Sequence, residues 1–392
     1  MVGVAFLHLA VSRGIRGAFG VFYVALLEAF GWSRAATAGA ISLSVIFEGF
    51  SLPFVGTLTD RLGLRKTLFL GGCVLALGLG FSATISSLWE LYLWVGLVTA
   101  LGLGLIGMVP HVAILSREFR EHRGIVLGLA YAGGGVGILL LVPLSQVMIG
   151  TWGWPVAYVG LAGLSALLVI PPTHILSAPS SSQPVVPAEE TGKRADWTVG
   201  RALSTSAFWL LFGLRVLASM GNQIVVTHQV AHAVDLGYTK LFAASIFGFM
   251  GVSSIFGRLF FGYLADHMRR EGVFTLVQVV SSLGVVALMV MQDSSDPWLL
   301  YAYAFFYGLG QGSRALVLSA ISAELFLGRS FGAIYGYFTL SIGIGGALGA
   351  WLGGFLYDLT DSYFIAFLVA LGCFVVSTMS VWAVRGAAKR SA

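Results

Sequence analysis

The chain has 392 residues, of which 57% are hydrophobic and only 10% are charged. Soluble globular domains carry about 25% charged residues, so this composition excludes a soluble fold and indicates a protein that lies in a lipid bilayer. The net charge of +5 does not indicate nucleic-acid binding, because the positions of the basic residues explain it as membrane topology.

Apolar runs long enough to cross a bilayer recur along the whole chain. A helix needs about 20 apolar residues to span the hydrocarbon core, and long continuous runs exclude a β-barrel. The sequence therefore predicts twelve transmembrane helices, at residues 3–28, 36–58, 67–87, 91–115, 124–149, 154–172, 207–233, 241–265, 272–291, 298–322, 330–356 and 363–384.

Residues 173–206 interrupt this pattern with a polar, charged and proline-containing stretch, which predicts a cytoplasmic linker. It separates an N-terminal six-helix bundle, residues 1–172, from a C-terminal one, residues 207–392. The two halves repeat each other, because adding 206 to a residue number aligns Gly31 with Gly237 without a gap. We therefore expect an all-α membrane protein built from two pseudo-symmetric bundles.

Lysine and arginine are distributed unevenly between the two expected sides of the membrane. With both termini inside, fifteen of the 22 basic residues fall in cytoplasmic segments, and only Arg34 and Lys240 fall outside. Cytoplasmic loops of membrane proteins carry such an excess. We expect a multi-pass protein of the plasma or inner membrane with both termini cytoplasmic.

A repeated motif follows the second and the eighth expected helices. Residues 56–66 read GTLTDRLGLRK, and the matching stretch of the second half reads GYLADHMRR. This pattern of glycine, aspartate and basic residues resembles the signature loop of the major facilitator superfamily, which folds as two six-helix bundles. We expect charge and helix-end contacts of these loops to hold a cytoplasmic gate. The expected gate residues are Asp60, Arg61, Arg65, Asp266 and Arg269.

Three further stretches resemble the monocarboxylate transporter branch of that superfamily and its bacterial relatives. They are GIRGAFGVFYVALLEAFGWSRA in the first helix, REFREHRGIVLGLAYAGGGVG at residues 117–137, and the segment from Ile255 to Arg258 in the eighth helix. In the family an arginine in that segment binds the substrate carboxylate, so the resemblance implies this role for Arg258. The planar fork of an arginine suits a carboxylate, because it donates two parallel hydrogen bonds.

The depth of Arg258 agrees with a ligand role. It precedes Asp266 by eight residues, which is about 12 Å along a helix. A guanidinium at that depth costs at least about 2.5 kcal/mol, and a bound anion offsets this cost.

Two positions depart from the family pattern. Proton-coupled members often carry an aspartate four residues before the arginine, where this chain has Ser254, and oxalate-exchanging relatives carry a lysine where the alignment places Phe338. Glu48 is related to Ser254 by the repeat and is the one carboxylate well inside an expected helix. Two roles remain open for Glu48, proton coupling or a structural ion pair with an arginine.

Other polar side chains in the expected helices are candidates for substrate binding. Arg13 and Arg16 share one face of the first helix, as Tyr307, Gln311 and Arg314 do in the tenth. The alternative role of Arg16 is to pair with Glu48 or with helix-end carbonyls, and the alternative for Arg314 is an internal pair or a position in a water-filled space. The candidates for substrate contact beside Arg258 are Arg16, Asn222, Gln223, Tyr307, Gln311 and Arg314.

Two polar residues of the seventh helix favour a structural interpretation. Arg215 lies eight residues into the helix, so its side chain is expected to reach the cytoplasm. His228 lies near the outer end, where we expect solvation. His111 in the fourth helix has no polar neighbour along the sequence, and either a structural role or proton relay fits it.

Five arginines against one glutamate inside the membrane indicate an anionic substrate. We expect a secondary transporter of small organic anions, with proton-coupled monocarboxylate symport by alternating access as the leading interpretation. The protein is expected to work as a monomer without a cofactor, an enzymatic activity or a nucleic-acid partner. One alternative is an exchanger or exporter of a larger or dicarboxylic anion, and another is a sensor that binds a carboxylate without transporting it.

Overall fold

The computed structural model describes residues 1–119, 123–175, 197–326, 328 and 330–391. Over these ranges the ordered elements are all helices, as predicted. Most of the expected linker and Arg120 of the helix-five motif lie outside the described residues. The last part of the expected linker is not irregular, because Val199–Leu203 forms the short helix α8.

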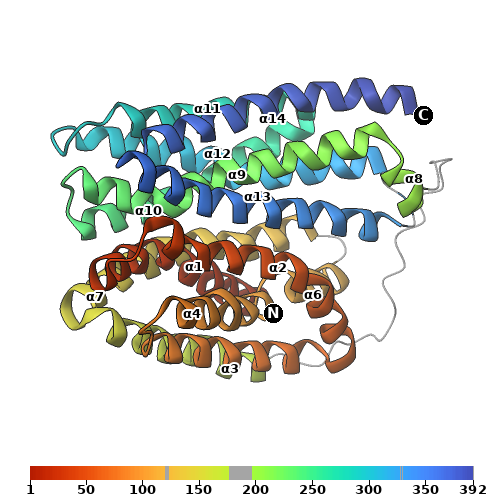
Figure 1. Ribbon diagram of the computed structural model, residues 1–392. Helices are drawn as coiled ribbons and strands as arrows, with labels where there is room; N and C mark the ends of the chain where they lie inside the picture. Colours follow the sequence, from red (N-terminus) through yellow and green to blue (C-terminus); the bar gives the residue numbers. More distant parts are fainter. Residues whose placement is uncertain (120–122, 176–196, 327, 329, 392) are drawn as a thin grey trace.

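The helices divide into two groups that lie one above the other in Figure 1, red to yellow below and green to blue above. The lower group contains α1 (Val2–Phe30), α2 (Arg34–Leu62), α3 (Leu64–Ser82), α4 (Leu88–Leu91), the π-helix η1 (Tyr92–Thr99), α5 (Ala100–Leu105), α6 (Met108–Glu118) and α7 (Arg123–Ile175). The upper group contains α8, α9 (Ser206–Asp235), α10 (Lys240–His267), α11 (Arg270–Val290), α12 (Pro297–Phe326), α13 (Phe331–Thr360) and α14 (Phe364–Ser391).

The predicted number of twelve spans is not confirmed by the described helices. Nine of them are long and apolar enough to cross a membrane, and α2, which bends by 53° near its middle, makes ten. One reason for the lower number is α7, a 53-residue run that covers two expected spans. Gly153 in α7 has φ of 83°, a left-handed conformation that glycine adopts without strain, and this residue kinks the run where the sequence predicts a turn.

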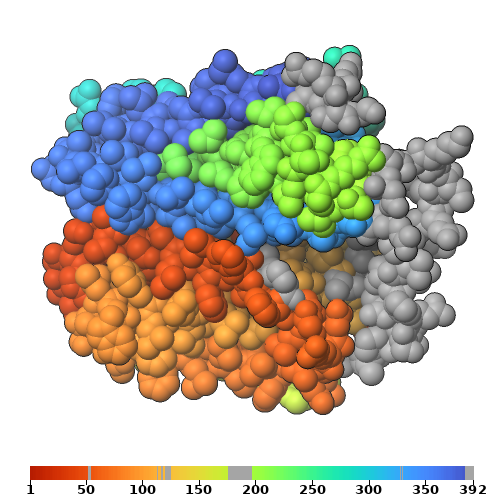
Figure 2. Space-filling model, turned by 45° about the vertical axis from the view of Figure 1, so that its right-hand side comes forward, coloured from red at the N-terminus to blue at the C-terminus, as the bar shows by residue number. Residues whose placement is uncertain are grey.

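The two halves meet along a seam where α2 packs against α13 and α7 packs against α10. Figure 2 shows this seam between the red and orange atoms of one half and the blue atoms of the other. Glycines bring the backbones close, since a Cβ added at Gly135 would lie 2.6 Å from the Gly251 carbonyl oxygen and one added at Gly251 would lie 2.7 Å from that of Gly135. Small residues allow this close approach of membrane helices.

Ion pairs join the halves at one end of the molecule, where α1 and α9 finish and α2 and α10 begin. We call it the Arg34 end. Arg34 Nη1 lies 2.8 Å from Asp235 Oδ2 and Arg34 Nη2 donates to Asp235 Oδ1 at 2.8 Å, while Lys240 Nζ lies 2.5 Å from Glu28 Oε2. Arg34 and Lys240 are 206 residues apart, so they are equivalent in the repeat. Each half therefore donates one cation to the other across the seam.

Asp358 of α13 caps the first turn of α2 from the opposite half. Its two carboxylate oxygens accept hydrogen bonds from the backbone N–H groups of Arg34 and Ala35, both at 2.8 Å. These N–H groups have no partner within their own helix and form the positive end of its dipole. Arg34 Nη1 also donates to the Tyr363 hydroxyl at 2.6 Å, and its guanidinium lies over the Tyr357 ring. The two halves are thus closed on each other at the Arg34 end.

Candidate functional site

Arg258 lies on α10 at the seam between the halves. Its Nη1 donates to the Tyr131 carbonyl of α7 at 3.0 Å, and its Nε donates to the Gly312 carbonyl of α12 at 3.2 Å. The side chain is half-buried, and these two hydrogen bonds leave further N–H groups of the fork for a ligand. The arginine that the family resemblance singles out therefore reaches from one half to the other.

Arg16 of α1 forms an ion pair with Glu48 of α2. The pair is within reach of water, because 19% of the Arg16 side chain and 30% of the Glu48 side chain are exposed. The structure thus shows the ion pair that the sequence offered as one of two roles for Glu48. An ion pair and proton coupling do not exclude each other, since protonation of the carboxylate dissolves the pair.

The sequence placed Arg13 on the same face of the first helix as Arg16 but did not single it out as a candidate for substrate contact. It is exposed, and it lies close enough to Arg16, Glu48 and Arg258 for their charges to interact. The signal that points to it is its three-residue spacing from Arg16. The proximity of Arg13 to Arg258 depends on the packing of α1 against α7, which could not be read from the sequence.

The four charged residues Arg13, Arg16, Glu48 and Arg258 form what we call the central cluster. Arg16 lies fourteen residues from each end of α1, about 21 Å in either direction. Three cations and one anion give the cluster a net charge of +2 when all are ionised. A positive, water-accessible cluster at mid-depth between two repeated halves has the location of a transporter substrate site.

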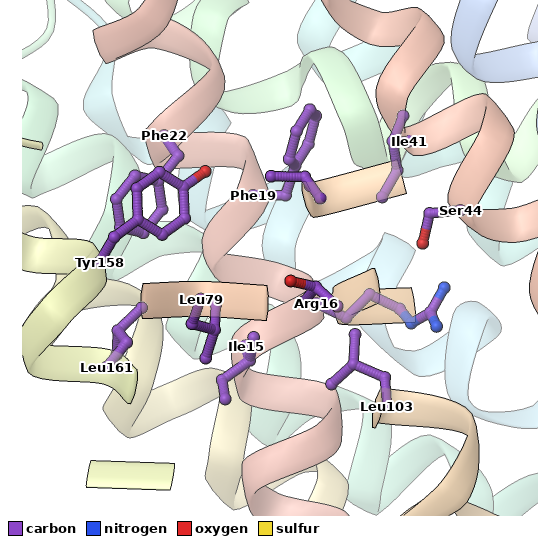
Figure 3. A pocket seen from close by; sticks show the side chains of 12 residues that line it. Ile15, Arg16, Phe19, Phe22, Ile41, Ser44, Leu79, Leu103, Tyr158 and Leu161 are labelled. Atoms are coloured by element: carbon purple, nitrogen blue, oxygen red, sulfur yellow. The ribbon is translucent and has the colours of Figure 1, made fainter. Parts of the chain in front are cut away.

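A small cavity lies beside Arg16 within the N-terminal half. It is lined by apolar side chains together with Arg16, Ser44 and Thr99, and Phe22 stacks on Tyr158 at one side of it. Figure 3 shows the Arg16 guanidinium pointing away from that aromatic pair, with Ser44 beside it. The charged end of Arg16 is therefore directed out of the apolar part of the cavity.

Arg314 belongs to a separate buried network inside the C-terminal half. Its Nε, Nη1 and Nη2 donate to Gln278 Oε1, Asn222 Oδ1 and Ser281 Oγ at 2.8, 2.8 and 3.0 Å. Tyr307 donates to the same Asn222 oxygen at 3.1 Å. The structure brings three predicted substrate residues together, namely Arg314, Asn222 and Tyr307, but it satisfies them with one another and with neutral groups.

The other two residues predicted to contact the substrate from the C-terminal half, Gln223 and Gln311, form fewer hydrogen bonds. Gln223 Nε2 donates to Thr227 Oγ1 at 2.9 Å on the same helix, and Gln311 is half-buried on α12. Neither contacts the Arg314 network through a hydrogen bond within the part of the chain that the structure describes. Their role in substrate binding stays a prediction.

Two expectations for α9 were wrong. Arg215 does not reach the cytoplasm, since it is 1% exposed, lies over the rings of Tyr335 and Phe338, and donates to Ser322 at 3.3 Å. His228 is not solvated, because it is fully buried and its Nε2 contacts the Ala350 carbonyl at 2.9 Å. In both cases α13 packs over the side chain. This burial could not be inferred from the position of the residue along α9.

His111 is not isolated from other polar groups. Its Nδ1 lies 2.7 Å from the Gly107 carbonyl, which can only accept, so this nitrogen carries a proton. Its Nε2 then accepts from His8 Nδ1 at 3.2 Å. Both rings are buried, and the pair joins α1 to α6.

The expected gate residues Asp60, Arg61, Arg65, Asp266 and Arg269 are all exposed, at the end of the molecule opposite the Arg34 end. Arg65 Nη2 lies 2.6 Å from His174 Nδ1 of the same half. Among the described residues, the structure shows no hydrogen bond or ion pair that links one of these five side chains to the opposite half. Contacts that close this gate between the halves are therefore not seen among the described residues, and the gate role of these five residues stays a prediction.

The two departures from the family pattern occupy ordinary structural positions. Ser254 is buried and donates to the Gly251 carbonyl of its own helix at 2.7 Å. Phe338 is fully buried and stacks on Phe208. Neither residue supplies an ionisable group, whereas Glu48 is a carboxylate that the structure pairs with an arginine of the central cluster.

Comparisons with known proteins identify the family of the chain. The model of the Major Facilitator Superfamily matches residues 5–312 and 233–392. Monocarboxylate transporter 13 of Rattus norvegicus is 29% identical over 379 residues, which cover 96% of this chain and 86% of that protein. Monocarboxylate transporter 11 of Homo sapiens is 30% identical over 374 residues, which cover 93% of this chain and 78% of that protein.

A solved structure confirms the fold. The crystal structure of the nucleoside transporter NupG superposes with a TM-score of 0.78, and the superposition covers 97% of this chain and 98% of that chain at 13% identity. A likeness at this identity concerns the architecture and not the substrate. The family match and the relatives together show that the chain belongs to the major facilitator superfamily, in which its relatives are monocarboxylate transporters, and that it is a multi-pass membrane transporter and not an enzyme.

Proposed function

We propose that the chain is a proton-coupled symporter of small organic monocarboxylates. The observation that carries the proposal is the central cluster, in which the water-accessible Arg16–Glu48 pair lies at mid-depth and Arg13 lies close to both this pair and Arg258. The relatives named monocarboxylate transporters support the substrate class. Arg258 would hold the substrate carboxylate with the N–H groups that the Tyr131 and Gly312 carbonyls leave free.

The arrangement of Glu48 supports coupling to a proton. While Glu48 is ionised, it occupies Arg16. When a proton binds Glu48, Arg16 is released and can face a substrate anion. The protonated, loaded cluster then carries three positive charges and one negative charge from the substrate, so its net charge of +2 equals that of the empty, ionised cluster. A carrier with equal charge in both states would move a proton and a monoanion together without moving net charge.

The two halves would rock around this site. The bundles, residues 1–172 and 207–392, would separate at the Arg34 end and close through Asp60, Arg61, Arg65, Asp266 and Arg269 at the other. The distribution of basic residues supports cytoplasmic termini and a cell-membrane location. Because each chain contains both halves of the site, we propose that it works as a monomer.

Uptake into proteoliposomes tests this function. We expect lactate or pyruvate to accumulate when an inward proton gradient is imposed, and succinate and benzoate to accumulate less. Flux that requires an anion preloaded inside the vesicles would instead indicate an exchanger. Binding without accumulation in either format would contradict transport and favour a carboxylate sensor.

Replacement of Glu48 by glutamine tests the coupling residue. Glutamine keeps the shape of the side chain but neither binds a proton nor neutralises Arg16, so we expect uptake to become insensitive to the proton gradient. Uptake of pyruvate at equal internal and external pH, compared with uptake under the gradient, measures this effect. Glu324→Gln is the matched control, because it removes an exposed ion pair with Arg270 away from the cluster. Stimulation by the gradient that persists in Glu48→Gln would disprove the assignment.

A further inference from the structure

The three arginines of the central cluster differ in what occupies them. Arg16 is paired with Glu48, and Arg258 donates to the carbonyls of Tyr131 and Gly312. Arg13 has no hydrogen bond or ion pair with any residue in the described ranges. It is therefore the cation of the cluster with the most donor capacity left for a ligand.

The surroundings of Arg13 show that it faces an internal space and not lipid. α1 is enclosed by α2, α7 and α9, and between Val4 and Leu27 every residue of α1 except Arg13 is buried or half-buried. A side chain that is exposed on an enclosed helix opens into a water-accessible space between the halves. Arg13 lies eleven residues from the start of α1, which is about 16 Å along the helix axis and well within the bilayer.

Arg13 and Arg258 face this space from opposite halves. Arg258 Nη1 donates to the Tyr131 carbonyl, and the Arg13 side chain lies against Gly134, three residues further along α7. The two side chains therefore meet the same part of α7, and their positive charges repel each other. A glycine makes room for Arg13, because a Cβ added at Gly134 of α7 would lie 3.0 Å from Arg13 Cγ. Two guanidinium groups held near each other are destabilised while empty, and an anion between them removes the repulsion.

We propose that Arg13 and Arg258 together form the carboxylate-binding site, with one carboxylate oxygen facing each guanidinium. The proposal rests on the proposed function and specifies how its substrate is held. A carboxylate has two oxygens with about four acceptor sites, so it satisfies two guanidinium groups at once. Since Arg13 belongs to the N-terminal half and Arg258 to the C-terminal half, a bound anion links the halves and favours the conformation in which both contacts exist.

Chemical modification tests the accessibility of Arg13 without a substitution. The purified full chain is treated with phenylglyoxal, which modifies exposed arginines, and the modified peptides are quantified by mass spectrometry. We expect Arg13 to be modified in buffer and to be protected by saturating pyruvate. Arg201 is exposed on the short helix α8, outside the central cluster, and serves as the internal control whose modification pyruvate leaves unchanged.

Kinetics of the Arg13→Gln variant test the binding role. We expect the KM for pyruvate to rise about 10- to 100-fold, the effect of losing hydrogen bonds from a charged group, with a smaller change in the maximal rate. Arg13→Lys is expected to restore part of the affinity because it keeps the charge without the fork. A purely structural role would lower the yield of folded protein and the maximal rate without changing KM.

The outcomes separate this inference from the function on which it rests. Proton-driven uptake by the unmodified chain, together with unchanged KM in Arg13→Gln or unprotected Arg13, would overturn the site while leaving the function intact. Absence of uptake of every acid by the unmodified chain would overturn both. Protection by pyruvate with a raised KM would support both.

Discussion

Uptake of pyruvate is expected to fall by about 100-fold or more when Arg258 is replaced by glutamine, since removing one partner of a buried charge contact costs about 2–5 kcal/mol. Glutamine cannot donate to the Tyr131 carbonyl, the Gly312 carbonyl and a substrate oxygen at the same time. The loss therefore affects both the substrate contact and the bond that links α10 to α7. Initial rates in proteoliposomes, at matched protein content, measure the effect.

Two further variants test whether the loss of uptake is specific to the guanidinium group of Arg258. Arg258→Lys keeps the charge but loses the planar fork, so it should retain more uptake than Arg258→Gln and less than the unmodified chain. Arg201→Gln removes an exposed arginine that lies over the Trp197 ring, and it should transport normally. Thermal unfolding of each variant in detergent shows whether it is folded. Uptake that survives in a folded Arg258→Gln variant would refute the role of Arg258.

Simultaneous replacement of Asp235 and Asp358 by asparagine is expected to open the Arg34 end. This is the second large effect that we expect. Partly exposed ion pairs contribute about 0.2–1 kcal/mol and a carboxylate cap contributes about 1 kcal/mol. Asparagine keeps one acceptor oxygen at the cap but loses the charge, so the double variant should shift the equilibrium between the halves by about 1.4 kcal/mol, or about tenfold. The reason is that Arg34 would keep none of its charged partners in the C-terminal half.

Cysteine labelling in detergent measures this opening. Ser42 of α2 donates to the Ala347 carbonyl of α13 at 2.7 Å, so a thiol placed there is covered while the seam is closed. In a background with Cys73 and Cys373 replaced by alanine, we expect Ser42→Cys to react with a maleimide about tenfold faster in the double variant. Asp293→Asn is the control, because this exposed aspartate accepts its hydrogen bonds from Ser295 of its own turn and not from the opposite half in the part of the chain that the structure describes. An unchanged labelling rate would show that these contacts do not hold the seam closed.

The helices and the repeated halves were predictable because the length of an apolar run is a local property of the sequence. The family-related segment around Arg258 was also local, and it singled out an arginine that the structure places at the seam, while its role in substrate binding stays a prediction. The Arg34 network was not predictable, because its partners lie 201 and 324 residues away along the chain. From the sequence, Arg34 and Lys240 were predicted only to be basic residues on the outer side of the membrane.

The errors at Arg215 and His228 have one physical cause. Depth along α9 was judged from residue number, while burial depended on α13, which packs over both side chains. Arg13 was undervalued for a related reason. Its three-residue spacing from Arg16 predicted a shared face, but only the packing of α1 and α2 shows that Glu48 occupies Arg16 and leaves Arg13 open.

The cap that Asp358 places on α2 couples the carrier to the salt around it. When the seam opens at the Arg34 end, the N–H groups of Arg34 and Ala35 pass from a carboxylate to water. Attraction between exposed charges weakens with ionic strength, because the Debye length falls from about 30 Å at 0.01 M salt to about 8 Å at 0.15 M. Dilute surroundings would hold the carrier shut at the Arg34 end, and saline surroundings would let this end open more often, so the rate of the transport cycle would depend on ionic strength.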